Sequence, residues 1–206
     1  MSFYTDAELR ELGLEHCGVG VKLSRRAALH GIARIRLGDH CRIDDFCVIS
    51  AGAGGIAIGR HVHIAAFCLL AGAARIELHD YAGLSSRVSI YSSSDDYSGE
   101  RMTNPTVPAE FTGVQSAPVT LGRHVIVGCG SVVLPGVTMH EGSGMGALSL
   151  VRRDCEPFGL YSGMPARRVA WRSDQMVRLG DALESTQRGQ PGAVSLARAC
   201  EDTVPT

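Results

Sequence analysis

The 206-residue chain is close to neutral, with 20 Lys and Arg against 21 Asp and Glu, and 45% of its residues are hydrophobic. This charge balance gives no electrostatic case for a nucleic-acid partner. No stretch approaches the roughly 20 apolar residues of a membrane span, and no apolar run follows a basic start. We therefore expect a cytoplasmic protein of one domain with short appendages.

The first segment, residues 1–19, predicts a helical cap. Thr5 and Glu8 have the spacing of a capping box, in which each side chain accepts a hydrogen bond at the start of a helix. Leu9 and Leu12 would lie on one side of the short helix that follows. Because the end of a repeat stack needs a cover, we expect this helix to close one end of the domain.

Residues 20–170 carry a six-residue period, most regular between Val119 and Glu156. The periodic aliphatic residues of that stretch are Leu121, Val127, Val133, Met139, Met145 and Val151. Neither a helix with 3.6 residues per turn nor a flat strand with a period of two keeps one residue in six on the same side. A solenoid with short flat walls does, because each side chain stacks on its equivalent one coil away. The period therefore predicts an all-β parallel solenoid.

Cysteine and histidine recur at fixed points of this period. Four cysteines come four residues after a periodic aliphatic, where other coils have Ser, Ala or Val: Cys41, Cys47, Cys68 and Cys155. We expect these to be small buried fillers and not disulfides or metal ligands. His40, His61 and His124 open their coils just after a Leu-Gly or Ile-Gly pair, which predicts turns with positive φ.

The period stops between Ile90 and Val119. Residues 92–118 are polar and begin with an acidic run that includes Asp95 and Asp96. Because the solenoid resumes in phase on the far side, we expect an inserted loop that carries function. The last segment, residues 171–206, predicts an amphipathic helix near residues 174–183 and a frayed tail from Gln187.

Three motifs of this sequence resemble those of a known protein family. The hexapeptide of residues 127–132 (VGCGSV), the loop that interrupts the period, and the closing SGMPAR of residues 162–167 resemble the left-handed parallel β-helix acyltransferases over about residues 20–170. The chain is most similar to sugar O-acetyltransferases of galactoside and maltose type and of surface-polysaccharide synthesis. This resemblance implies a homotrimer with active sites between subunits, acetyl-CoA as cosubstrate and no metal. The implied reaction is direct attack of a sugar hydroxyl on the thioester.

The family's basic histidine is missing at the loop entrance, where an ungapped alignment places Asp95. The family's pocket asparagine falls on Ala65. His63 offers a substitute, since it precedes an inward Ile64 and should face outward, where a carboxylate could orient its imidazole. Our leading hypothesis is a His63/Asp95 pair, with Asp96 as a substrate contact or substitute partner. The alternative is a surface histidine and an acidic pair that only shapes a turn.

On the donor side, the resemblance implies that CoA runs along successive coils. The positions that it assigns to CoA are Cys129, Ala147, Arg152, Arg153 and Arg167. Small side chains let pantetheine approach the backbone, and guanidinium groups suit phosphates, although the arginines could equally form a solvated rim. On the acceptor side, Tyr91 and Tyr97 join Ala65 as candidate sugar contacts.

Three other functions stay open. The first is N-acetylation of an amino sugar or a nucleotide amino sugar. The second is a catalytically inactive solenoid scaffold that has lost the family histidine. The third is a γ-class carbonic anhydrase, which shares the solenoid and binds zinc through histidines, but the expected pair of histidines five residues apart is absent from this sequence.

Overall fold

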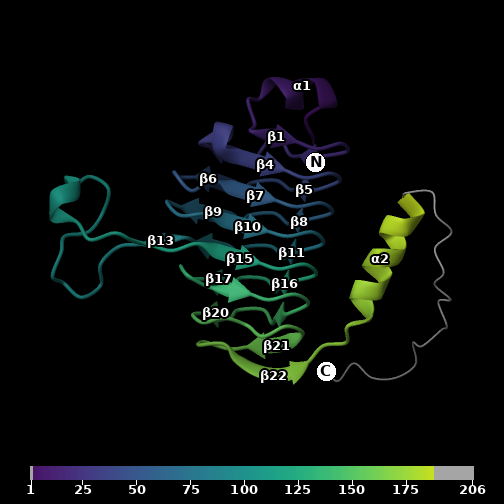
Figure 1. The fold of residues 1–206 in the computed structure, drawn as a ribbon. Helices are drawn as coiled ribbons and strands as arrows, with labels where there is room; N and C mark the ends of the chain where they lie inside the picture. The colour runs from purple at the N-terminus through teal and green to yellow at the C-terminus, as the bar shows by residue number, and fades with distance from the viewer. Residues whose placement is uncertain (1, 188–206) are drawn as a thin grey trace. The chain divides into compact units, whose positions relative to one another are not determined.

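The computed structural model describes residues 2–187, so the tail that we expected from Gln187 lies almost wholly outside the described residues. Residues up to Ser173 form one compact unit, and the segment from Asp174 forms another. The first unit is a left-handed parallel β-helix, in which three parallel sheets form the walls of a stack of coils (Figure 1). The predicted fold class is confirmed.

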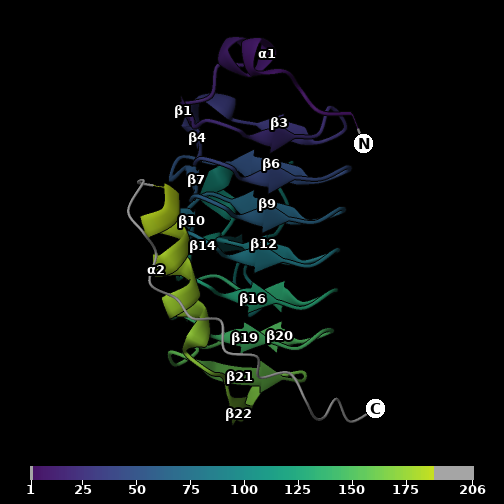
Figure 2. The ribbon, with the colours of Figure 1, turned by 90° about the vertical axis from the view of Figure 1, so that its right-hand side faces the viewer.

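Short strands that pair one coil apart build the three walls. The first wall contains β1 (His16–Cys17), β4 (Ile35–Leu37), β7 (Ile56–Ile58), β10 (Ile76–Leu78), β15 (Val119–Leu121) and β18 (Thr138–Met139). The second wall contains β2 (Lys22–Leu23), β5 (Arg42–Ile43), β8 (His63–Ile64), β11 (Gly83–Leu84), β16 (Ile126–Val127), β19 (Gly144–Met145), β21 (Gly159–Ser162) and the antiparallel β22 (Arg167–Trp171). The third wall, which faces the viewer in Figure 2, contains β3 (Ala28–His30), β6 (Val48–Ala51), β9 (Leu69–Gly72), β12 (Ser89–Tyr91), β17 (Val132–Val133) and β20 (Leu150–Val151).

The periodic aliphatic side chains form the core, as the sequence predicted. Ile43, Ile64 and Leu84 pair in register along the second wall, and each is at most 1% exposed. Burial of each such side chain contributes about 1.5–3 kcal/mol, which short strands need because they make few hydrogen bonds each. The cysteines expected as fillers are buried as well: Cys41, Cys47, Cys68 and Cys155. Burial raises the pKa of the Cys41 and Cys155 thiols to about 12.

The edge between the first and second walls carries the recurring histidines. His40, His61 and His124 have φ between 55° and 59°, which confirms the predicted turns. Tyr81 takes the same position in the intervening coil at φ 64°. The four rings stack in sequence, with centroids 4.8 to 5.3 Å apart. The histidines at this edge therefore have a structural explanation.

Two additions to the solenoid were expected from the sequence. Helix α1 (Asp6–Glu11) has the predicted capping box between Thr5 and Glu8, and it buries Leu9 against the core. Strand β1 already lies within the segment expected as the cap. The inserted segment between β12 and β15 extends away from the stack (Figure 1). It contains the antiparallel pair β13 (Ser93–Ser94) and β14 (Gln115–Ser116) and the short helical turn η2 (Ala109–Phe111). A second short helical turn, η1 (Ile32–Arg34), lies between β3 and β4.

Arg172 links the last coils along the edge between the first and second walls. Its Nη1 donates hydrogen bonds to the carbonyl oxygens of His124, Gly142 and Ser143, at 3.3, 2.6 and 3.0 Å. The second unit contains helix α2 (Gln175–Gln187), close to the helix expected near residues 174–183. Within residues 2–187, none of the helices has the length and apolar character required to cross a membrane.

Candidate active site

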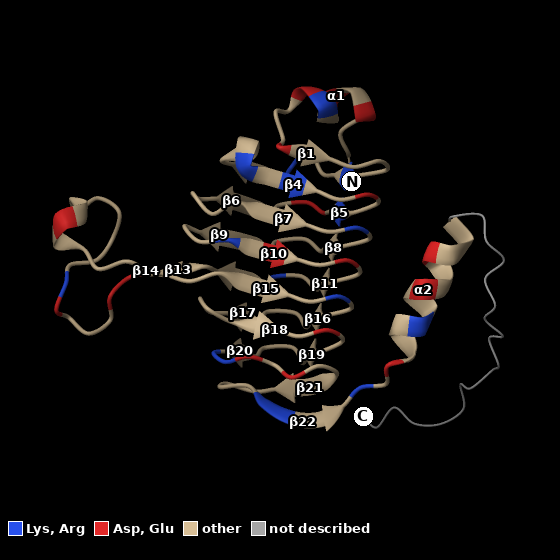
Figure 3. Cartoon of the chain, in the orientation of Figure 1, with Lys and Arg blue, Asp and Glu red and all other residues tan. Residues whose placement is uncertain are grey.

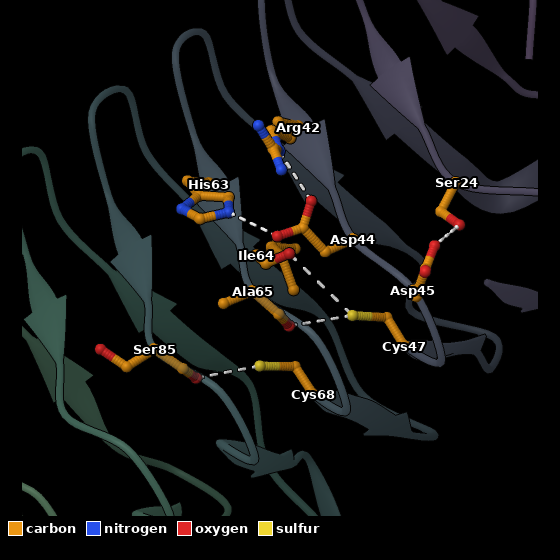
Figure 4. Close-up of polar contacts among 10 residues, drawn as sticks. All are labelled: Ser24, Arg42, Asp44, Asp45, Cys47, His63, Ile64, Ala65, Cys68 and Ser85. Atoms are coloured by element: carbon orange, nitrogen blue, oxygen red, sulfur yellow. Dashed lines mark hydrogen bonds and ion pairs between the residues drawn. The ribbon is translucent and has the colours of Figure 1, made fainter. Parts of the chain in front are cut away.

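His63 stands on the outer face of the second wall, as its place before the inward Ile64 predicted. Its side chain is 52% exposed, and its Nε2 lies 3.0 Å from Oδ2 of Asp44 (Figure 4). Arg42 and His63 are paired in register in β5 and β8, which brings Asp44 beside the ring from the preceding coil. The carboxylate that contacts His63 is therefore Asp44 and not Asp95. The expected His63/Asp95 contact is not made within the chain.

The carboxylate of Asp44 contacts two side chains, those of Arg42 and His63. Its Oδ1 accepts a hydrogen bond from Nε of Arg42 at 2.6 Å, and its Oδ2 contacts His63. Burial opposes ionisation of this carboxyl group, because Asp44 is only 5% exposed. The hydrogen bonds from Arg42 and His63 outweigh that effect and lower the pKa of Asp44. An ionised Asp44 can orient the imidazole and stabilise its protonated form.

The sequence reasoning missed Asp44 and a second polar residue, Ser85. Leu84 pairs with Ile64, so Ser85 takes the position of Ala65 one coil further on, and both follow an inward residue on the same wall. Their backbone is braced from inside, since Cys47 Sγ contacts the carbonyl oxygen of Ala65 at 3.1 Å and Cys68 Sγ that of Ser85 at 3.2 Å. The six-residue period held the signal for these positions, because it aligns residues 44, 65 and 85.

The two acidic residues at the loop entrance have different roles. The carboxylate of Asp96 accepts hydrogen bonds from the backbone N–H and hydroxyl of Ser98 and from the backbone N–H of Arg101, and these bonds lower its pKa. Asp96 therefore shapes a turn, in line with the alternative that we kept open. Among residues 2–187, the Asp95 carboxylate has neither a hydrogen bond nor an ion pair, so it is available to a ligand or a neighbouring subunit.

The expected sugar-contacting tyrosines belong to the same region. Tyr91 ends β12 and is partly buried. Tyr97 lies in the inserted segment and is 93% exposed. Its ring makes too little contact with this chain to be fixed by it. Its assignment as a substrate contact stays a prediction.

The expected CoA-contacting residues Cys129 and Ala147 lie on the edge between the second and third walls. Both are exposed, and the backbone N–H of Leu148 donates to the carbonyl oxygen of Cys129 at 2.8 Å. A Cβ atom on the neighbouring Gly128 would lie 2.5 Å from the backbone nitrogen of Ala147. Adjacent coils thus pack backbone against backbone at this point, and Cys129 and Ala147 form a strip of small exposed side chains along this edge.

Four arginines gather at the C-terminal end of the solenoid. Arg152, Arg153, Arg167 and Arg168 line a pocket of about 410 Å³ between β20 and β22; Figure 3 shows this end in blue. Arg168 is already engaged, by Glu156 at 3.1 Å and by the ring of Trp171. The side chains of Arg152 and Arg153 make no hydrogen bond or ion pair with any described residue. The pocket can therefore accept phosphate groups.

These groups occupy two edges of the solenoid. Cys129 lies between β16 and β17, whereas Asp95 follows β12 and β13, beyond the far side of the third wall. One chain alone does not bring these groups together. In the part of the chain that the structure describes, no three His, Cys, Asp or Glu side chains converge as a metal site would require, so the carbonic anhydrase alternative gains no support.

Comparisons with known proteins define the class to which this fold and site belong. No family model matches the chain. A dTDP-4-amino-4,6-dideoxy-D-glucose acyltransferase from Escherichia coli is 45% identical over 189 residues, which cover 92% of this chain and 98% of that protein. A galactoside O-acetyltransferase from Escherichia coli K12 is 39% identical, but only over 26% of this chain and 27% of that protein.

Among solved structures, AntD, an N-acyltransferase from Bacillus cereus, was crystallised with dTDP and 3-hydroxybutyryl-CoA. It superposes with a TM-score of 0.87 and 34% identity, covering 91% of this chain and 98% of that one. The chain belongs to the hexapeptide-repeat sugar acyltransferases. The resemblance stated from the sequence is confirmed at the level of the family.

Proposed function

We propose that this protein is an acyl-CoA-dependent N-acyltransferase whose acceptor is a dTDP-linked 4-amino-4,6-dideoxy sugar. The observation that carries the proposal is the 45% identity to the Escherichia coli acyltransferase over nearly the full length of both chains. It is supported by AntD, which has also been crystallised with dTDP-4-amino-4,6-dideoxyglucose and coenzyme A. These relatives favour the alternative of N-acylation over our leading hypothesis of O-acetylation.

The chemistry of an amine also explains the missing family histidine. A sugar hydroxyl needs a base to take its proton during attack, and a carboxylate with a pKa of about 4 is poor at this. A neutral amine attacks the thioester carbonyl without prior deprotonation. The C–N bond forms, the C–S bond breaks, and the proton lost by nitrogen is balanced by formation of the CoA thiol. An aspartate at the loop entrance then suffices to hold and orient the amino group.

Asp95 and Ser85 are our candidates for this role. In the AntD structures, a serine and an aspartate ten residues further on have each been substituted. Ser85 and Asp95 have the same order and spacing here. We assign Asp95 to the amino group and the Ser85 hydroxyl to the thioester carbonyl or its oxyanion. His63, oriented by Asp44, remains the candidate for accepting the amine proton.

The acyl donor fits the strip and the pocket described above. Pantetheine would lie along Cys129 and Ala147, and the phosphates of CoA would reach Arg152, Arg153 and Arg167. A homotrimer would supply Asp95 of one subunit to the edge of the next, which would bring together groups that a single chain keeps apart. No step of this scheme requires a metal. We place the reaction in the cytoplasm, where nucleotide sugars and acyl-CoA meet.

A paired acceptor assay tests this function. The purified protein, acetyl-CoA and dTDP-4-amino-4,6-dideoxyglucose should release CoA thiol and yield a product that resists hydroxylamine, as amides do and esters do not. The control acceptor is dTDP-glucose, which has a hydroxyl in place of the amine at C4 and a further hydroxyl at C6. Turnover of dTDP-glucose or a galactoside with no turnover of the amino sugar would restore the O-acetylation hypothesis. Acetyl-CoA binding without turnover of any acceptor would favour an inactive scaffold.

A further inference from the structure

The edge between the second and third walls carries a column of stacked aromatic and cationic side chains. Phe46 and Phe67 occupy equivalent positions in consecutive coils, with ring centroids 5.1 Å apart and an interplanar angle of 20°. The guanidinium of Arg26 lies over the outer face of Phe46 at 5.6 Å, and that of Arg87 lies over Phe67 at 5.2 Å. We call these four residues the Phe46 column.

Both rings are about half exposed, at 48% and 50%. Their faces are occupied by each other and by the two guanidinium groups, so a ligand meets only the ring edges. Phe46, Phe67 and Arg87 have φ from 62° to 65°, which directs these three side chains in the same way along the edge. The column is therefore a support for its two terminal arginines and not a platform on which a base could stack.

The two arginines differ in their other partners. Arg26 has an ion pair with Asp45 at 3.7 Å. Arg87 is exposed, and its side chain makes no hydrogen bond or ion pair with any described residue. A guanidinium held flat on an aromatic ring keeps its N–H groups pointing outward, and it loses less conformational freedom when it binds a phosphate. Arg87 has the features of a pre-oriented phosphate ligand.

The place of Arg87 along the edge decides which phosphate it can reach. It follows Ser85 by two residues, on the coil where we place the reacting thioester. Towards the C-terminus the same edge position is filled by Gly130 and Leu148, beside the strip assigned to pantetheine. In acyl-CoA, the whole pantetheine arm separates the thioester from the diphosphate, which fits the distant arginine pocket. In a nucleotide sugar, the diphosphate is attached directly to the sugar that carries the amine.

Resting on the proposed function, we infer that Arg87 binds the diphosphate of the nucleotide-sugar acceptor, and that the ring of Phe67, on which it stacks, holds its guanidinium in position. Neighbouring coils are roughly 4.8 Å apart, so a diphosphate that is one hexose away from the amine falls within a coil or two of Ser85. Donor and acceptor diphosphates would thus be bound at separate sites, since Arg152 and Arg153 follow β20 on the edge between the third and first walls. With separate phosphate sites, the affinity for the acyl donor and the affinity for the acceptor can change independently.

The test is calorimetric titration of the full chain with dTDP and, separately, with acetyl-CoA. We expect Arg87→Ala to weaken dTDP binding about 10- to 100-fold, as loss of a charged hydrogen bond should. Acetyl-CoA binding should change less than about twofold. Arg87→Lys should recover only part of the affinity, because it keeps the charge and loses the flat fork. Arg26→Ala is the matched control, since it removes a stacked arginine from the other end of the column, and it should leave dTDP binding unchanged.

Steady-state kinetics supply a second readout, in which Arg87→Ala should raise KM for the amino sugar with little change in kcat. Circular dichroism melting checks that each variant folds. If Arg87→Ala binds dTDP as tightly as the wild type does, the inference is overturned and the proposed function stands. A loss of acetyl-CoA binding with no loss of dTDP binding has the same consequence. Failure of the wild-type protein to bind dTDP would overturn the proposed acceptor and this inference together.

Discussion

The imidazole of His63 and the carboxylate of Asp44 meet at 3.0 Å although 19 residues separate them along the chain. Parallel pairing of β5 with β8 brings them together, and Arg42 holds the other carboxylate oxygen at 2.6 Å. This places an oriented imidazole on the outer face of the wall that also carries Ser85. The contact makes Asp44 a positioning residue for His63, and it has a pH-dependent energetic consequence.

We expect Asp44→Asn to destabilise the protein by about 1–3 kcal/mol at pH 7, because the charged hydrogen bonds to Arg42 and His63 weaken. The folded-state pKa of Asp44 is lowered, so its contribution is present above the unfolded pKa and is lost as pH falls through the folded pKa. The difference in Tm between the wild type and the variant should be full at pH 6–7 and should shrink below about pH 4.

Thermal melts from pH 3 to 7 measure this difference. Glu110→Gln is the matched control, since Glu110 is exposed and its side chain has no hydrogen bond or ion pair among the described residues. Its Tm difference from the wild type should stay small at every pH. A Tm difference for Asp44→Asn that persists unchanged at pH 3 would show that the carboxylate charge is not responsible.

The sequence predicts the fold and the turns because they are periodic properties. Two positions in every six face inward, the periodic aliphatic and the residue four places after it, which located the core and the buried cysteines. The same period located the positive-φ histidines such as His61. Asp44 was not found as a partner of His63, because period alone does not say which outward side chain of an adjacent coil turns toward it. The place of Asp95 depends on a segment that leaves the stack. The stacking of Arg87 on Phe67 was not predicted, because a hydrophobic pattern does not say in which direction exposed side chains point.

Close packing of coils at Gly128 predicts a site-specific effect on stability. An alanine Cβ there would lie 2.5 Å from the nitrogen of Ala147, so the next coil must shift. We expect Gly128→Ala to cost about 1–3 kcal/mol, a drop in Tm of roughly 2 to 10 °C. Gly83→Ala is the control, since a Cβ there meets nothing within 4 Å. Equal melting temperatures for both variants would show that the coils at Gly128 can separate.

The exposed thiol of Cys129 offers a direct test of the donor path. Iodoacetamide at pH 8 should label Cys129 first, because the other cysteines on the solenoid are buried or, like Cys17, partly buried with a raised pKa. Saturating acetyl-CoA should slow the labelling of Cys129 by about tenfold or more if pantetheine covers it. Mass spectrometry of the labelled peptides measures both rates. Cys17 is the internal control, and slowing at both cysteines would indicate a general change in accessibility.

Charge reversal at Arg167 tests the arginine pocket. Arg167→Glu should raise KM for acetyl-CoA about tenfold or more, because a phosphate loses a guanidinium and gains a repulsive carboxylate. The control is a donor without the nucleotide, S-acetyl-N-acetylcysteamine, for which kcat/KM should be unchanged. A KM for acetyl-CoA equal to that of the wild type would identify the arginines as a solvated rim.

Asp95 and His63 have different proposed roles, holding the amine and accepting its proton, and the two roles make different predictions. If Asp95 holds the amine, Asp95→Asn should lower kcat/KM about 10²-fold or more. If His63 takes the proton, His63→Ala should lower kcat by a similar factor and change the shape of the pH–rate profile.

The matched comparison is Asp96→Asn, which disturbs the turn at Ser98 and should cost less than Asp95→Asn. Full turnover by His63→Ala would remove the histidine from the mechanism and leave its contact with Asp44 as a structural one. Full turnover by Asp95→Asn would remove the carboxylate from the acceptor site. Because His63 lies on the second wall and Asp95 lies beyond the third wall of the same chain, a mixed oligomer of the two single variants gives a further result. Subunits that carry only His63→Ala, mixed with subunits that carry only Asp95→Asn, should regain activity if each site combines residues from two neighbours.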